Sequence, residues 1–178
     1  MNLRKQSLFT LMTALLLTVI FTILLPGTAA AQETNKTYII GTDVTFAPFE
    51  YKDVDGEYKG IDVDLLDAIA KDQGFNYELR PLGFSAALQA LESNQIDGMI
   101  AGMSITPERQ ESFDFSDPYF ESGVVMAVSE TNDGITSYED LEGKTVAVKV
   151  GTTGAAFAES IQEEFGFELN TFEDSANM

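Results

Sequence analysis

The residues best suited to binding chemistry surround Thr106-Pro107, where the sequence predicts the start of a helix. A hydroxyl residue followed by proline is typical of the N-cap and first position of a helix. Arg109 then falls in the first turn, where free backbone N–H groups and a guanidinium together suit a carboxylate. Ser104, just upstream, adds a hydroxyl. This group predicts an anion site, although Arg109 taken alone is better explained as an ordinary exposed residue.

Other polar and aromatic residues follow the predicted strands, at the ends where open α/β sheets bind their ligands. They are Asp43, Phe46, Phe49, Phe84, Gly102 and Lys149. A donor, an acceptor and aromatic rings at one sheet edge would form a slot for a small polar molecule. Each residue also has a simpler explanation: the Phe rings as core, Asp43 as a turn cap and Lys149 as surface. The hypothesis therefore requires all of them to reach one edge of the sheet.

The composition excludes several kinds of chemistry. The 178 residues contain no His and no Cys, which removes His/Cys zinc sites, thiol nucleophiles, disulfides and triads with a histidine base. The formal net charge of -19 argues against nucleic-acid binding, because phosphate recognition needs an excess of basic residues. Hydrophobic residues make up 44%, so the acidity does not indicate disorder. Solubility outside the cell is the simplest explanation of the charge.

Two motif-like segments do not support a cofactor or a metal. Gly151-Thr152-Thr153-Gly154 follows a predicted strand and opens a predicted helix, but no Gly-Lys-Ser/Thr follows, so no nucleotide is expected. The Asp-rich segment 53–62 partly imitates a calcium loop, and a hairpin turn at Asp55-Gly56 explains it better. The carboxylates are too numerous for any pair to be singled out as acid and base, and most are expected at the surface. We therefore expect no cofactor, no metal and no catalytic residue.

The elements that must position these residues alternate between strand and helix, which predicts a mostly parallel sheet covered on both faces. Apolar runs predict strands, and apolar residues at helical spacing predict helices that end at Gly74 and Gly166. The expected strands are Tyr38–Asp43, Phe75–Leu79, Ile96–Ala101, Gly123–Val128, Lys144–Lys149 and Phe167–Phe172. The expected helices are one with Ile61, Leu65 and Ile69 on its apolar face, Ser85–Ser93, one starting at Thr106, a turn with a Thr136/Glu139 capping box, and one with Phe157, Ile161 and Phe165 on one face.

Residues 1–31 have the order of a secretory signal peptide. Arg4 and Lys5 precede the uncharged run Leu8–Leu25, and Ala29-Ala30-Ala31 supplies a cleavage motif. The uncharged run also reaches the length of a membrane span, so an uncleaved anchor is the alternative. With no Cys, the chain has no site for an N-terminal lipid anchor. In either case the remainder is expected to be exported, in the periplasm or at the cell surface.

Five ordered motifs resemble the extracytoplasmic solute-binding proteins of family 3, which serve ABC importers for polar amino acids. They are Gly41-Thr42-Asp43 with Phe46-Ala47-Pro48-Phe49-Glu50, Gly60–Leu65, Ala101–Arg109, Phe113–Tyr119, and Val146–Lys149 with Gly151-Thr152. The similarity runs from about Tyr38 to Met178 and is greatest to glutamine-binding members. It implies an α/β, periplasmic-binding-protein-like fold whose two lobes close on a ligand like a flytrap. Lobe 1 would span 34–118, a hinge crossing 119–123, and an incomplete lobe 2 124–178, in a C-terminally truncated chain.

The resemblance also implies how the backbone-like part of an amino acid would be held. Arg109 and Ser104 would bind the α-carboxylate, joined by the backbone N–H of Thr153 when the lobes close. The carbonyl of Gly102 would accept a hydrogen bond from the ammonium. Family members carry a Gly or another small residue where Thr153 stands, which leaves the geometry of that turn open.

The remaining candidates would hold the ligand's side chain. Phe46 and Phe84 would enclose its aliphatic stem, and Asp43 and Lys149 match residues that glutamine-binding members place around the amide. A donor and an acceptor together suit a neutral amide, whereas Lys149 would repel a cation. Glutamine is the expected ligand, with glutamate or asparagine as the alternatives.

The resemblance implies a binding protein that makes and breaks no bond. It would deliver its ligand to the permease of an ABC importer, either as a monomer or fused to that permease. Two other functions remain open on this fold: a periplasmic dehydratase acting on prephenate-like acids, and a sensor domain outside the membrane. The Asp43 and Lys149 pair argues against the dehydratase, which has no need of an amide-binding pair.

Overall fold

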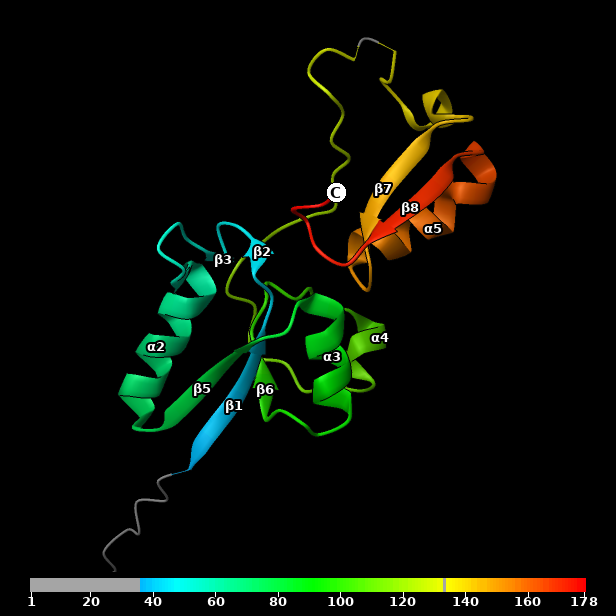
Figure 1. The fold of residues 1–178 in the computed structure, drawn as a ribbon. Coiled ribbons are helices and arrows are strands. Elements are labelled where there is room, and N and C mark those ends of the chain that lie inside the picture. Colours follow the sequence, from blue (N-terminus) through cyan, green and yellow to red (C-terminus); the bar gives the residue numbers. More distant parts are fainter. Residues whose placement is uncertain (1–35, 133) are drawn as a thin grey trace, which may run out of the picture. The chain divides into compact units, whose positions relative to one another are not determined.

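The computed structural model describes residues 36–132 and 134–178. The predicted signal peptide lies outside the described residues, as does the start of the predicted lobe 1. Within the described residues, no helix has both the length and the apolar character needed to cross a membrane. The described chain is α/β, with two parallel sheets and a small antiparallel one (Figure 1).

The first parallel sheet carries the N-terminal strand at its centre. β1 (Thr37–Thr42) lies between β5 (Asn76–Pro81) and β6 (Gly98–Met99), in the order β5-β1-β6. The first two strands match the predicted ones, and β6 is shorter than predicted. One reason is that the side chain of Asp97 accepts the N–H of Ile39 (2.9 Å). Next to Ile39, a carboxylate thus takes the place of the backbone carbonyl that would accept this N–H in a regular strand pair.

Two helices, α2 and α3, connect the elements around this sheet. α2 (Ile61–Gln73) ends at Gly74, whose φ of 70° is the left-handed conformation predicted for a glycine stop. α3 (Phe84–Glu92) follows the predicted boundaries and packs against β1 and β6 through the fully buried Ala87. The close approach explains a glycine in β1, since a Cβ at Gly41 would lie only 3.3 Å from the Cβ of Ala87.

The predicted apolar face of α2 is wrong by one position. Ile61 and Ile69 are exposed, and the buried residues are Asp62, Leu66 and Ala70. The four-residue spacing is the same for both sets, so the pattern alone favours the more hydrophobic one. The carboxylate of Asp62 is buried because distant groups donate hydrogen bonds to it, which the local sequence does not reveal.

A three-stranded antiparallel sheet precedes α2 and consists of β2 (Thr45–Phe46), β3 (Glu50–Lys52) and β4 (Tyr58–Lys59). The predicted hairpin turn joins β3 to β4. Asp53 Oδ1 accepts two backbone N–H groups of the turn, each at 2.9 Å, and Gly56 adopts a φ of 88°. The Asp-rich segment thus organises a turn.

The predicted helix start at Thr106 is confirmed by α4 (Pro107–Gln110), in which the Thr106 side chain accepts the N–H of Arg109 at 3.2 Å. The strand predicted at Gly123–Val128 is wrong. No strand of the described residues pairs with it, and Val125 is 87% exposed. A strand requires a neighbour for its backbone N–H and C=O groups, so an apolar run by itself does not suffice.

The C-terminal elements form a second parallel pair. β7 (Thr145–Lys149) pairs with β8 (Glu168–Phe172), and α5 (Thr153–Phe165) packs on both (Figure 1). A short 3-10 helix, η1 (Tyr138–Leu141), contacts α5. Their shared core contains Leu141, Val148, Ala155, Ala158 and Phe167. α5 ends, as predicted, at a left-handed Gly166.

Two local predictions in this part are corrected. The capping box is formed by Ser137 and Asp140 and not by Thr136 and Glu139, because the carboxylate of Asp140 accepts the N–H groups of both Thr136 and Ser137. Phe157 is exposed against Tyr138, because small alanines of α5 face the strands instead.

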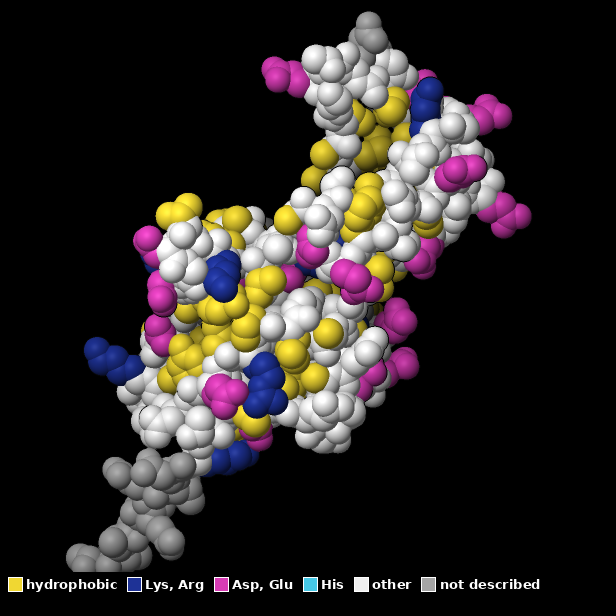
Figure 2. Space-filling model, viewed as in Figure 1, with side chains coloured by type: hydrophobic (Ala, Val, Ile, Leu, Met, Phe, Trp, Pro, Cys, Tyr) yellow, Lys and Arg dark blue, Asp and Glu magenta, His cyan; other side chains and the backbone are white. Residues whose placement is uncertain are grey.

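The surface carries most of the acidic residues. Figure 2 shows Asp and Glu side chains scattered over the visible face without a single large cluster, as expected if the charge serves solubility. Four charged residues of the described chain are buried instead: Asp43, Glu50, Asp62 and Lys149. Burial of charge is costly unless it is paired, so these four define the part of the molecule in which polar chemistry matters most.

Candidate functional site

Arg109 is held by two backbone carbonyl groups that are far apart in sequence. Its Nη1 donates to Ser104 O and its Nη2 to Gly151 O, both at 2.9 Å. The guanidinium also lies over the ring of Phe84, 5.6 Å from its centroid. Burial lowers the pKa of Arg109, yet a guanidinium stays charged in proteins. A charged, planar donor held in this way is suited to a carboxylate.

The turn after β7 comes next to this group. Ser104 Oγ and Thr153 Oγ1 lie 3.4 Å apart. Thr152 caps α5 by accepting the N–H of Ala155 (3.2 Å), which makes Thr153 the first residue of the helix. Backbone N–H groups of a first helical turn lack partners within the helix. The N–H of Thr153 therefore needs a partner from outside the helix, and its turn adjoins Ser104.

Asp43 and Lys149 form a buried ion pair. Their side chains are 2% and 7% exposed, and Lys149 Nζ contacts Asp43 Oδ2. Lys149 also reaches Thr45 Oγ1 at 3.5 Å, and Asp43 Oδ1 accepts the N–H of Val44 at 2.8 Å. The pair places one acceptor and one donor side by side. Each charge neutralises much of the field of the other.

The aromatic candidates differ in their environment. Phe46 is 39% exposed, and one face of its ring stacks on Phe49 with centroids 5.3 Å apart. Phe84 is buried and belongs to the core, while also contacting Arg109. Gly102, with a φ of 53°, lies so close that a Cβ there would be 2.8 Å from the Phe46 ring.

All predicted site residues therefore take part in a few local contacts: Phe46 with Gly102, Arg109 with Ser104 and Phe84, Ser104 with Thr153, and Asp43 with Lys149. Whether they bind a ligand remains a prediction. The expectation that all of them reach one edge of a single sheet is wrong, because β1, which Asp43 follows, and β7, which Lys149 ends, belong to different sheets. The chemistry available is a cationic carboxylate clamp, an exposed aromatic face and a donor–acceptor pair.

Sequence reasoning missed three residues beside this group. Glu50 and Asp62 are buried carboxyl side chains, and the hydroxyl of Tyr119 donates to Asp62 Oδ1 at 2.9 Å. All three occur in motifs that carry the family resemblance, which was the available signal. The expectation that most carboxylates lie at the surface does not hold for Glu50 and Asp62. In the described part of the chain, no group of three or more His, Cys, Asp or Glu residues could hold a metal ion.

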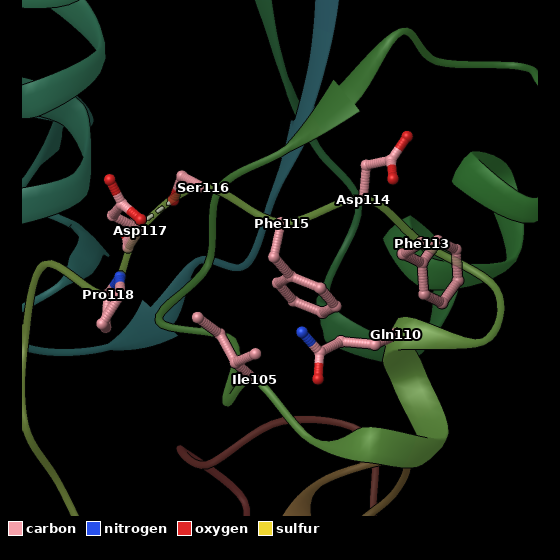
Figure 3. Close-up of a pocket in the computed structure, with 8 residues that line it drawn as sticks. All are labelled: Ile105, Gln110, Phe113, Asp114, Phe115, Ser116, Asp117 and Pro118. Atoms are coloured by element: carbon pink, nitrogen blue, oxygen red, sulfur yellow. Dashed lines mark hydrogen bonds between the residues drawn. The ribbon is translucent and has the colours of Figure 1, made fainter.

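A hollow of about 570 Å³ opens elsewhere, beside the segment that follows α4. It is lined by Ile105, Gln110 and residues 113–118. Figure 3 shows the side chains of Ile105, Gln110 and Phe115 pointing toward the same space. None of the predicted binding residues lines it, so it is distinct from the group around Arg109.

Known proteins resemble the chain over most of its described length. The family model for bacterial extracellular solute-binding proteins, family 3, matches residues 38–172. The arginine-binding extracellular protein ArtP of Bacillus subtilis (strain 168) is 41% identical over 142 residues, which cover 80% of this chain and 52% of ArtP. The chain thus spans about half the length of the curated relatives it matches.

Solved structures agree. An ancestral arginine-binding protein, 42% identical, superposes with a TM-score of 0.75 when bound to arginine and 0.74 when bound to glutamine, covering 79% of this chain and 62% of that one. The ancestral amino acid-binding protein AncCDT-1, described as a precursor of cyclohexadienyl dehydratase, is 37% identical with a TM-score of 0.70, covering 79% and 63%. These matches confirm the α/β two-lobe fold class, of which the chain covers part. The chain belongs to family 3 of the bacterial extracellular solute-binding proteins.

Proposed function

We propose that the protein containing this chain binds a polar L-amino acid outside the cytoplasmic membrane and delivers it unchanged to the permease of an ABC importer. The observation that carries this proposal is the Arg109 guanidinium, which is held beside Ser104 and the Gly151 turn by two carbonyl oxygens. An α-carboxylate is a stronger acceptor than either carbonyl. The family membership supports the same function.

The α-carboxylate would bind Arg109, the Ser104 N–H and hydroxyl, and the N–H of Thr153. The ammonium would donate to the carbonyl of Gly102. Because these contacts involve only the part common to all L-amino acids, they set the ligand class and leave selectivity to the side chain. The aliphatic stem would lie on the exposed face of Phe46 and reach toward Phe84.

Glutamine is the side chain that the Asp43–Lys149 pair supports best. An amide can accept from Lys149 through its oxygen and donate to Asp43 through its NH₂ group, so both buried charges keep a partner. Asparagine is too short to do both from the same position, and glutamate supplies no donor. One solved relative is described as bound to glutamine.

Arginine is a second candidate, favoured by the charge around the pair. The expectation that Lys149 repels a cation is weakened, because Asp43 already neutralises it. Asp62 adds a further buried carboxyl group, so acids outnumber the one buried lysine of the described residues. The names of two relatives also refer to arginine.

The lobes proposed are residues 34–118 and 124–178, connected by 119–123, and closure on the ligand would create the form that docks on the permease. We propose an exported protein, periplasmic or at the cell surface, with a cleaved or retained signal segment, acting as a monomer or fused to its permease. A dehydratase or a sensor domain remains the alternative, since AncCDT-1 is described as a precursor of an enzyme.

The test is calorimetry and thermal shift on the complete protein with L-glutamine, L-arginine, L-glutamate, L-asparagine and prephenate. A ligand at about a hundred times its dissociation constant should stabilise the protein by roughly 2.7 kcal/mol. Lys149→Met should weaken glutamine binding and spare arginine, because it frees Asp43 for a guanidinium. No heat of binding and no thermal shift with any amino acid, together with consumption of prephenate, would refute the transport function in favour of the enzyme.

A further inference from the structure

Two buried carboxyl groups form no ion pair with any of the described residues. Glu50 in β3 and Asp62 in the first turn of α2 are both 0% exposed. The third buried acid, Asp43, is paired with Lys149. A buried carboxylate without a counter-charge is unstable unless hydrogen bonds replace its lost solvation. The hydrogen bonds available to each acid therefore decide how it is accommodated in the fold.

The side chain of Asp62 accepts two hydrogen bonds. Its Oδ2 accepts the backbone N–H of Gly102 at 2.7 Å, and its Oδ1 accepts the hydroxyl of Tyr119 at 2.9 Å. Its place in the first turn of α2 also favours a negative charge, because of the helix dipole. Asp62 thus joins the loop after β6, which carries Gly102, to the segment that begins at Tyr119.

Glu50 has no such donors. Neither of its carboxyl oxygens has a hydrogen-bond partner among the described residues. Its neighbour in sequence, Phe49, accepts the backbone N–H of Asp62 at 2.9 Å, so two fully buried carboxyl groups lie on adjoining segments. Two carboxyl groups can share a hydrogen bond only when one of them carries a proton. Burial first, and then the carboxyl groups of Asp62 and Asp43, raise the pKa of Glu50 to about 9, against the opposing effect of Lys149.

We infer that Glu50 is a positioning residue of the binding site, acting as a neutral acid that donates to the Asp62 carboxylate and so fixes Gly102 and Tyr119. The inference rests on the proposed function, in which the Gly102 carbonyl receives the ligand ammonium. Glu50 does not touch the ligand in this role. It keeps Asp62 in place, and Asp62 keeps the binding loop in place.

Loss of the Glu50 proton would put two negative groups against each other in a buried space. The groups that face Glu50 are Asp62, Asp43, Lys149 and the hydroxyl of Tyr119, and Lys149 is already engaged by Asp43. Repulsion would then move the Asp62 carboxylate, and the N–H of Gly102 would lose its acceptor. Ligand affinity should fall at alkaline pH for this reason.

The test compares the complete wild-type protein with Glu50→Gln, whose amide still donates to Asp62 and does not titrate. Affinity for L-glutamine and L-arginine is measured by calorimetry from neutral to alkaline pH, each profile normalised to its own value at pH 7. Between about pH 8 and 10 the wild type should lose up to roughly tenfold more affinity than Glu50→Gln. Glu78→Gln is the matched control, because Glu78 is an exposed acid paired with Arg80. Its affinity should change with pH as that of the wild type does, including any change caused by titration of the ligand itself.

Glu50→Ala removes the donor and should bind more weakly at every pH, while Gln restores most of the loss. Parallel profiles for wild type and Glu50→Gln would overturn the inference. So would a loss in Glu50→Gln as large as that in Glu50→Ala, because it would mean that Glu50 contacts the ligand as an anion.

A second measurement needs no ligand and separates this inference from the proposed function. The backbone ¹⁵N–¹H resonance of Gly102 should titrate at alkaline pH in the wild type and stay constant in Glu50→Gln, because its acceptor is Asp62. A Gly102 resonance that ignores pH in both proteins would refute the positioning role even if amino acids bind. Failure of every amino acid to bind, with Gly102 titrating as expected, would refute only the proposed function.

Discussion

Replacing Glu50 with Gln should make the stability of the protein less dependent on pH. The side chain is fully buried, and its pKa is raised from 4.5 to about 9 by burial and then by Asp62. The folded state therefore holds a proton that the unfolded chain releases above about pH 4.5. The contribution of Glu50 to stability is complete below that pH and is lost as the pH rises toward 9.

The magnitude follows from one proton. The free energy of unfolding of the wild type should fall by about 1.4 kcal/mol per pH unit across this window, and Gln contributes no such slope. From pH 6 to 8 the difference between Glu50→Gln and the wild type should therefore grow by about 3 kcal/mol in favour of the variant. The variant should be the more stable protein at pH 8.

Urea denaturation of the complete protein, repeated at several pH values between about 5 and 9, measures the difference in unfolding free energy between the two proteins. Glu78→Gln serves as the control, because its side chain is exposed and its removal should leave the wild-type slope. Wild-type and Glu50→Gln curves that run parallel would mean that Glu50 is ionised in the fold. The reasoning about a shared proton would then be refuted.

Two further predictions concern backbone fit and carboxylate binding. Gly60→Ala should destabilise the protein by more than about 3 kcal/mol, since a Cβ at its φ of 129° would lie 2.1 Å from the carbonyl oxygen of Phe49. Gly74→Ala is the control: Gly74 has a φ of 70° and a Cβ there would have no atom within 4 Å, so the loss should be only about 1 kcal/mol. Equal losses of unfolding free energy in urea titrations would contradict this prediction. Arg109→Lys should weaken amino-acid binding at least about tenfold, because an ammonium cannot make two parallel hydrogen bonds, whereas Arg80→Lys on the surface should bind normally by calorimetry. Unchanged affinity in Arg109→Lys would exclude the carboxylate clamp.

The local pattern of the sequence determined most element boundaries. α2 and α5 end where Gly74 and Gly166 were expected to stop them, and α4 begins directly after its N-cap Thr106, because these signals act within one turn of the chain. The pairing of Asp43 with Lys149 does not follow in this way, because β1 and β7 belong to different sheets and strand order alone does not bring their ends together. The family followed from motif order, independently of any contact.

Tertiary structure alone decided which residues lie inside. The buried face of α2 is Asp62 and its neighbours, and not the more hydrophobic Ile61 and Ile69, because Gly102 and Tyr119 donate to Asp62 from far along the chain. For the same reason the apolar run at 123–128 is no strand, since no described strand lies beside it. The raised pKa of Glu50 likewise comes from burial and from Asp62, which is distant in sequence. Hydrophobic pattern is a property of neighbours in sequence, whereas burial of a charge depends on partners that only folding brings together.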